Sequence, residues 1–278
     1  MSIPESTSSL LCFIRDYGRI DDEFVYRYMF FDSVYETLTT KNIWVKDVIS
    51  FNDSLELYYG KTVLLEFLFK LKNSSYIKNF LKNNNAQIEL AIKGIEEVIR
   101  DLSNYKNSDV FVLCLSREFS HENYSKYGDS CIKLHLGNLI TNITDCVLDS
   151  KVFYSKEERD HILEDEGFKN YLINKIVYDN DVDSIKMIMQ LMLPLFKEEH
   201  WSEEKEFRFI FHKRIMRDFD KGYFNFVYCD NTDIKERRLE MSFNDINNPV
   251  VEVDIQNVVV IDQIKVDTII KDGFKVVR

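Results

Sequence analysis

Phenylalanine alternates with charged residues in one short segment of the chain, and this pattern predicts a β-strand. Phe207, Phe209 and Phe211 recur at a spacing of two residues, as in a strand that buries one face. If these rings face the core, the charged side chains beside them share the other face. Those charged residues are Glu204, Glu206 and Arg208. We therefore expect two carboxylates and a guanidinium on one face of a rigid element, with Trp201 just upstream. The alternative is a solvent-facing edge strand with a surface ion pair.

Further runs of apolar, β-branched and aromatic residues predict more strands. The run at 110–116 is almost continuously apolar, which is typical of a strand buried on both faces. The other predicted strands lie at 24–30, 43–45, 132–136, 223–228, 250–254, 258–261 and 274–277.

Between these strands, apolar residues recur at helical intervals, for example at Ile88, Ile92, Ile95 and Ile99. We predict a helical insertion at about residues 56–105 and a helical segment at about residues 156–196. No linker or internal repeat divides the sequence. Strands before and after a helical middle, without regular βαβ alternation, favour a single α+β domain over residues 1–278. Its core is expected to be a mixed or antiparallel sheet.

Composition and charge narrow the class of protein. A net charge of −11 argues against a protein that coats nucleic acid nonspecifically. The five cysteines and five histidines are scattered without metal-ligand spacing, so we expect no metal site. The sequence has no signal-like start and no apolar run long enough to span a membrane. We therefore expect a soluble, cytoplasmic protein without a membrane partner.

Four segments together resemble a bacterial and phage family of unknown function, the domain-of-unknown-function family numbered twenty-nine seventy-one. The segments are Tyr26-Arg27-Tyr28, Phe51-Asn52-Asp53, a buried strand ending in Ser116 followed by Tyr124-x-x-Tyr127-Gly128, and Lys197…Trp201-x-x-Glu204-x-Glu206-Phe207-Arg208. The resemblance spans roughly residues 24–211. Ser54 and Tyr124 stand where the family usually has Pro and Trp. The resemblance implies a toxin or phage-defence context, in which an antitoxin or another partner protein is expected.

The order of Arg, Ser and Glu-x-Glu along the chain is also similar to the pattern of ADP-ribosyltransferases. That resemblance implies a split sheet, with NAD as the substrate. Arg27 would clamp the pyrophosphate, and Ser116 would orient Glu206 or a ribose hydroxyl. Tyr124 or Tyr127 would stack on nicotinamide, and Tyr28 and Trp201 complete the expected NAD contacts.

The two carboxylates would perform the chemistry. Breaking the nicotinamide–ribose bond passes through a ribosyl cation, which a carboxylate at Glu206 would stabilise. Glu204 would polarise the nucleophile of an acceptor, which is a protein, a nucleic acid or water. The expected activity is an NAD-dependent ADP-ribosyltransferase or NAD glycohydrolase.

Two alternatives from other classes stay open. The first is a metal-dependent nuclease, because Glu203-Glu204-Lys205 fits a Glu-x-Lys catalytic strand, to which Asp53 or Glu56 would add a ligand. The second is a non-catalytic sensor or interaction module, whose charged strand binds a partner protein. Arg27 has a structural alternative as well, as the partner of a carboxylate such as Asp53 or Glu56.

Overall fold

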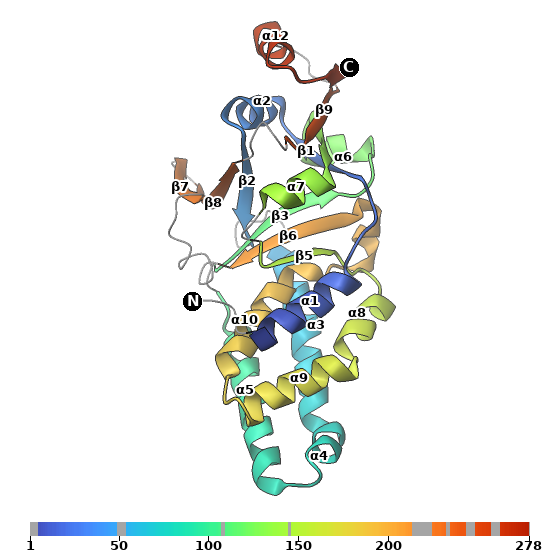
Figure 1. The fold of residues 1–278 in the computed structure, drawn as a ribbon, viewed down its shortest axis with the longest axis vertical. Coiled ribbons are helices and arrows are strands. Elements are labelled where there is room, and N and C mark those ends of the chain that lie inside the picture. Colours follow the sequence, from blue (N-terminus) through green and yellow to red (C-terminus); the bar gives the residue numbers. More distant parts are fainter. Residues whose placement is uncertain are drawn as a thin grey trace.

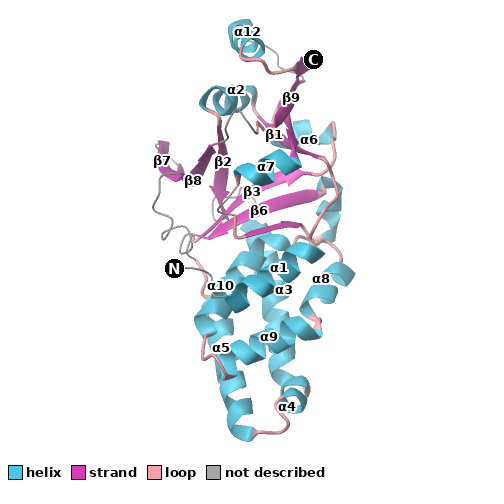
Figure 2. Ribbon diagram, viewed as in Figure 1, coloured by secondary structure: helices cyan, strands magenta, loops and turns pink. Residues whose placement is uncertain are grey.

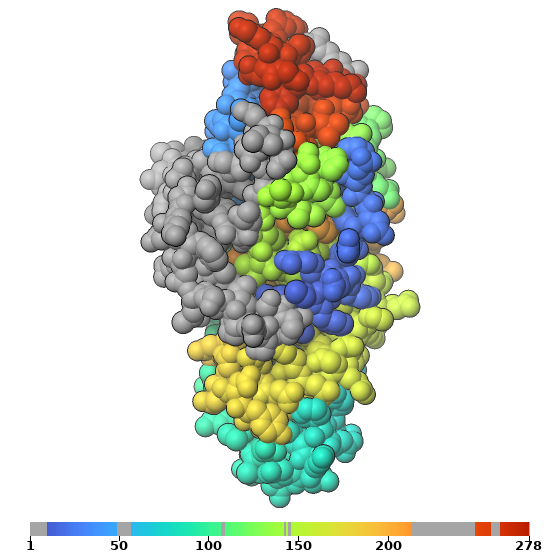
Figure 3. Space-filling model, in the orientation of Figure 1, coloured from blue at the N-terminus to red at the C-terminus, as the bar shows by residue number. Residues whose placement is uncertain are grey.

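The computed structural model describes residues 5–48, 54–106, 109–143, 146–212, 224–231, 234–242, 248–256 and 262–277. The molecule is elongated (Figure 3), with helices forming one end and a sheet with its own helices forming the other (Figure 1). Helices α4 and α12 mark the two extremes of the long axis (Figure 1). The motif Phe51-Asn52-Asp53 and the predicted strand at 258–261 lie outside the described residues.

One forked sheet joins ten described strands. Strand β3 (Val110–Ser116) pairs along one edge with β6 (Glu206–His212), which in turn pairs with β5 (Leu148–Lys151). Along its other edge, β3 pairs with two strands, β1 (Phe24–Met29) near Ser116 and β2 (Asn42–Asp47) near Phe111 and Val112. The sheet therefore divides at β3 into two branches.

The branch that begins with β1 continues through β4 (Ser130–His135), β9 (Val250–Ile255) and β10 (Val276–Val277). The branch that begins with β2 continues through β8 (Ile234–Ser242) and β7 (Phe224–Asn231). All of these ladders are antiparallel except the pairing of β9 with β10. The prediction of a mixed, largely antiparallel sheet is confirmed.

Helices cover both faces of the sheet (Figure 2). One face packs on a large core with α1 (Glu5–Tyr17), α3 (Ser54–Asn73), α4 (Tyr76–Phe80), α5 (Asn85–Ser103), α8 (Lys156–Leu163), α9 (Glu166–Val177) and α10 (Val182–Met192). The other face packs on α2 (Phe31–Thr40), α7 (Leu136–Asn142) and α12 (Gln263–Lys271). We call these faces the large-core face and the small-core face.

The alternation of side chains along β6 assigns each residue to one of these faces. Phe207, Phe209 and Phe211 belong to the small core, whereas Ile210 belongs to the large core. The prediction that the three rings are buried together is confirmed. Because both faces of β6 are covered, the alternative of a solvent-facing edge strand is wrong.

The predicted helical regions are also confirmed. Helices α3, α4 and α5 lie in the predicted insertion, and α8, α9 and α10 lie in the segment at 156–196. Their apolar stripes form most of the large core, so both regions pack directly on the sheet. Within the described part of the chain, no helix combines the length and the apolar composition that a membrane span requires.

Gly60 allows α3 to approach the short 3-10 helix η2 (Leu193–Leu195) closely, because a Cβ at this position would overlap the Leu193 carbonyl oxygen. We predict that Gly60→Ala lowers the free energy of unfolding by about 1–3 kcal/mol through overpacking. Gly167→Ala is the control, because its Cβ would meet only the side chain of Asp165. Urea unfolding followed by circular dichroism measures both variants. Equal stabilities for the two variants would contradict the close contact.

Candidate functional site

The two motif glutamates lie on either side of a sharp turn. Glu204 ends the 3-10 helix η3 (Glu199–Glu204), and Glu206 begins β6. Lys205 between them adopts a left-handed conformation with φ 44°. The Ser116 hydroxyl donates to the Glu204 carbonyl oxygen (3.0 Å), and the Arg117 amide donates to that of Lys205 (2.9 Å). The prediction that Glu204 lies within the strand is therefore wrong, but the turn still brings both carboxylates together.

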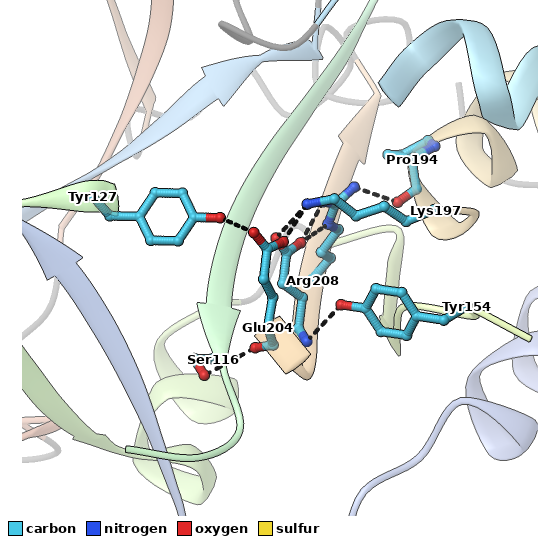
Figure 4. Close-up of polar contacts among 8 residues, drawn as sticks. Ser116, Tyr127, Tyr154, Pro194, Lys197, Glu204 and Arg208 are labelled. Carbon is cyan, nitrogen blue, oxygen red and sulfur yellow. Dashed lines mark hydrogen bonds and ion pairs between the residues drawn. The ribbon is translucent and has the colours of Figure 1, made fainter. Parts of the chain in front are cut away.

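Glu204 is a buried carboxylate with a partner on each oxygen. Its side chain is 2% exposed. The Tyr127 hydroxyl donates to Oε1, and the Lys197 ammonium donates to Oε2 (Figure 4). Burial raises the pKa of Glu204, and the nearby charge of Glu206 adds to this, while Lys197 and Tyr127 oppose it.

Glu206 shifts in the opposite direction. Its Oε1 accepts from Lys197 (3.1 Å), and its Oε2 accepts from the Arg208 Nε (2.6 Å) as well as from a terminal nitrogen of the same guanidinium. Burial alone would raise the pKa of Glu206, but Arg208 and Lys197 outweigh it and lower the pKa to about 2. One carboxyl of the pair thus binds protons more readily than an ordinary glutamate, and the other stays ionised.

Arg208 connects this cluster to the helical part of the molecule. It is 1% exposed and donates to the Pro194 carbonyl oxygen in η2 (2.6 Å). The Tyr154 hydroxyl accepts from the Glu206 amide (3.0 Å), next to the same group of charges. We call Lys197, Glu204, Glu206 and Arg208 the carboxylate cluster. The cluster joins β6 to the segment that follows α10 and carries Lys197.

The carboxylate cluster lies beside two aromatic rings that are partly exposed. Tyr127 is 42% exposed, and Trp201 is partly exposed. The Lys197 ammonium lies 5.3 Å from the centre of the Trp201 ring, and Lys126 lies over the same ring at 5.9 Å. Chemically, this arrangement offers a permanent carboxylate, a protonatable carboxyl and aromatic walls.

Arg27 does not join the cluster. Val25 and Ile132 belong to the small core, and Arg27 shares their face because it pairs with Ile132. Tyr26 is next to Val25 in β1, so its side chain lies on the opposite, large-core face. Ser116 pairs with Tyr26, and Glu206 pairs with Ser116, so Glu206 also projects from the large-core face. The expectation that Arg27 and Glu206 line one cleft is therefore not met.

Arg27 instead closes the fork of the sheet. Its guanidinium donates to the Trp44 carbonyl oxygen of β2 (2.7 Å), so a side chain of β1 binds the other branch. Burial lowers the pKa of Arg27 to about 10, with Cys114 of β3 acting in the opposite direction. This contact explains the arginine structurally, as a tie between the branches.

Tyr28 and Tyr124 pack together and are not placed as NAD contacts. The Tyr28 hydroxyl accepts from the Ser120 amide (2.6 Å), and Tyr124 is 7% exposed with its ring 5.1 Å from that of Tyr28. They hold the segment with α6 (Glu122–Tyr127) against β1. Ser116 donates only to main-chain carbonyl oxygens, those of Glu118 and Glu204. It positions the turn and does not contact the Glu206 carboxylate.

The Glu-x-Lys arrangement of a nuclease is not assembled at this turn. Glu203 is exposed, while the Lys205 ammonium pairs with Glu118 at 2.6 Å. Among the described residues, no group of three or more His, Cys, Asp and Glu side chains is arranged to hold a metal ion. Asp53 and the Glu56 side chain lie outside the described part of the chain.

The structure adds Lys197 and Tyr154 to the expected site, and it shows that Arg208, expected on the same face as the glutamates, binds Glu206 directly. Lys197 and Arg208 stand in the motif, and their charge next to two acids was an available signal. Tyr154 has no signal in the sequence, because it reaches Glu206 from the distant segment that follows β5.

Comparisons with known proteins found no matching family model, no similar curated protein and no similar solved structure. The family resemblance therefore stays a prediction, and function has to be inferred from the geometry of the site.

Removing the Arg208 guanidinium would leave Glu206 buried with one cation fewer. We predict that Arg208→Met lowers the free energy of unfolding by about 3–5 kcal/mol. The control is Glu118→Gln, which breaks an exposed pair with Lys205 and should cost less than about 1 kcal/mol. Chemical denaturation measures both. A loss for Arg208→Met as small as that of the control would show that the cluster contributes little to stability.

The depressed pKa of Glu206 also predicts a dependence of stability on pH. The ionised Glu206 carboxylate stabilises the folded state. This contribution is complete above the ordinary glutamate pKa of 4.5 and is lost as the pH falls toward about 2. The pKa of Glu204 is raised, so its contribution to the stability of the folded state changes with pH in the opposite direction. We predict that Glu206→Gln flattens the acid-side fall in unfolding free energy, measured by urea titrations between these pH values. An unchanged slope would contradict the assignment.

Proposed function

We propose that the chain cleaves the N-glycosidic bond between nicotinamide and ribose in NAD, and transfers the ADP-ribosyl group to water or to a macromolecule. The observation that supports this most is the carboxylate cluster, in which two adjacent glutamates share Lys197 and have oppositely shifted pKa values. Environments that separate the pKa values of two carboxyls are typical of acid–base pairs in active sites.

The chemistry assigns a different role to each carboxyl. The bond between ribose C1′ and the ring nitrogen breaks, and its electron pair leaves with the nitrogen, so the pyridinium becomes neutral nicotinamide without a proton. Glu206, ionised throughout, stabilises the ribosyl cation. The acceptor oxygen then attacks C1′ and gives its proton to Glu204, whose raised pKa favours taking it.

The surroundings also support a small aromatic leaving group. Tyr127 and Trp201 border the cluster with partly exposed rings, and each offers a face on which nicotinamide can stack. Substrate entry requires Lys197 to move from Glu206, since the carboxylate is otherwise engaged on both oxygens. Arg27, Tyr28 and Tyr124 take no part in this version of the site.

The resemblances of the sequence supply the wider context. A split sheet is implied by the likeness to ADP-ribosyltransferases, and the fork between β1 and β2 is compatible with it, although Arg27 fills the fork. A cytoplasmic toxin or antiviral-defence effector is the setting that the family likeness implies. The acceptor macromolecule and any antitoxin belong to the same proposal.

A second candidate is a non-catalytic interaction module. One observation favours it: all four carboxylate oxygens of Glu204 and Glu206 already have partners within the chain. Buried pairs of this kind can also serve to fix one conformation. In that case, the cluster would hold η3 and β6 in place, and partner binding would survive neutralisation of Glu206.

Nicotinamide release from NAD tests the proposal. We predict that the wild-type protein releases nicotinamide, and that Glu204→Gln and Glu206→Gln each lower the rate by about 10²-fold or more. Glu203→Gln is the matched control, because Glu203 is adjacent in sequence but exposed. It should retain the wild-type rate. Circular dichroism confirms that each variant is folded.

Two results would contradict the proposal. The first is the absence of nicotinamide release by the wild type, with or without cell extract as a source of acceptors. The second is magnesium-dependent cleavage of DNA or RNA without nicotinamide release, which would favour the nuclease.

A further inference from the structure

A groove on the helical side of the molecule has an excess of positive charge. It has a volume of about 610 Å³ and lies between α5 and α10. Its walls include Lys93, Glu97, Arg100 and Asp101 from α5, with Lys186 and Gln190 from α10. Lys93, Glu97 and Arg100 are three or four residues apart, so they form one face of α5, and Asn104 follows directly after its end. A volume in this range suits a ligand of nucleotide size.

The acidic groups of the groove already have partners within the chain. Glu97 pairs with Lys186 at 2.6 Å. Asp101 accepts from the Gln190 amide at 3.2 Å. Asp109, the third acid of the lining, also has an interaction partner. Glu97 is therefore neutralised within the chain, and Asp101 is hydrogen-bonded to a neutral amide.

Three cations of the groove have no such charged partner among the described residues. Lys93, Arg100 and Lys106 line it, and none of them lies within ion-pair distance of a carboxylate in the described parts of the chain. Arg100 lies in the last turn of α5, where the helix dipole favours a cation. Lys93 in the middle of the helix and Lys106 beyond its end receive no such stabilisation. In a protein of net charge −11, three exposed cations without a carboxylate partner among the described residues thus line one groove.

We propose that this groove binds a phosphorylated small molecule with at least two negative charges. Arg100 offers paired donors that match phosphate oxygens, while Lys93 and Lys106 add point charges. The partly buried ring of Tyr105 lies in the wall and provides an aromatic surface for a nucleobase.

The groove is separate from the carboxylate cluster. Gln190 of the groove contacts His212 at the last residue of β6 (3.2 Å), whereas Glu206 is the first residue of that strand. The proposal therefore does not depend on NAD cleavage. A direct binding measurement tests it even if the protein turns over no NAD.

Isothermal titration calorimetry of the 278-residue protein tests the groove with two probes, inorganic tripolyphosphate and ATP, at matched ionic strength. We expect saturable binding with one ligand per chain. We also expect the double variant Lys93→Gln/Arg100→Gln to bind at least tenfold more weakly. Both residues are exposed on a helix, so the variant should keep the wild-type unfolding temperature. Lys78→Gln, an exposed position on α4, is the control and should bind normally.

The two probes distinguish the class of ligand that the groove binds. Tighter binding of ATP than of tripolyphosphate would support a nucleotide, and equal binding would support an oligophosphate site without base recognition. The proposal is overturned if neither probe binds saturably at millimolar concentration. It is also overturned if the double variant binds as tightly as the wild type, or if Lys78→Gln weakens binding equally.

Discussion

Lys197 lies between the buried carboxylate of Glu204 and the partly buried one of Glu206, and the structure around β6 depends on how its single charge is shared. It donates to both Glu204 and Glu206, while Arg208 donates to the Glu206 carboxylate. Removing charges from water is costly, so such a group persists only with complete hydrogen bonding. Here two cations face two carboxylates, which makes the cluster neutral when both acids are ionised. The second cation on Glu206 explains why this carboxyl stays ionised while the pKa of Glu204 rises.

The position of the cluster gives it consequences beyond its own contacts. Arg208 reaches the Pro194 carbonyl oxygen in η2, the short helix against which α3 packs at Gly60. The same strand that carries Glu206 and Arg208 on one face carries three phenylalanines into the small core on the other. The cluster therefore ties the helical part of the molecule to the centre of the sheet, where β3 and β6 are buried on both sides.

Much of this architecture could be predicted from local patterns. The spacing of two in Phe207, Phe209 and Phe211 correctly gave a strand with buried rings, and helical stripes located both helical regions. The distribution of charged side chains was harder to predict. A period of two places Glu204 in the strand. However, Lys205 adopts a left-handed conformation, and β6 begins only after it, at Glu206. Nothing in the sequence specifies that turn.

The failure at Arg27 has a different cause. Its residue type and its place before β2 were compatible with a phosphate clamp, yet the face of a strand is set by its register with distant strands. Pairing of Arg27 with Ile132 sends the side chain toward the fork, where the Trp44 carbonyl oxygen accepts from it. Long-range pairing also brings Tyr127 and Tyr154 to the glutamates, which no spacing in the sequence reveals.

The two glutamates are unequally ionised, and carbon-13 NMR of the side-chain carboxyl groups measures this difference directly. In protein labelled at glutamate, the signals of Glu204 and Glu206 are assigned by their loss in the corresponding glutamine variants. We predict that the Glu206 signal titrates near pH 2 and the Glu204 signal above the ordinary glutamate value of 4.5. Titration of both signals together near 4.5 would contradict it.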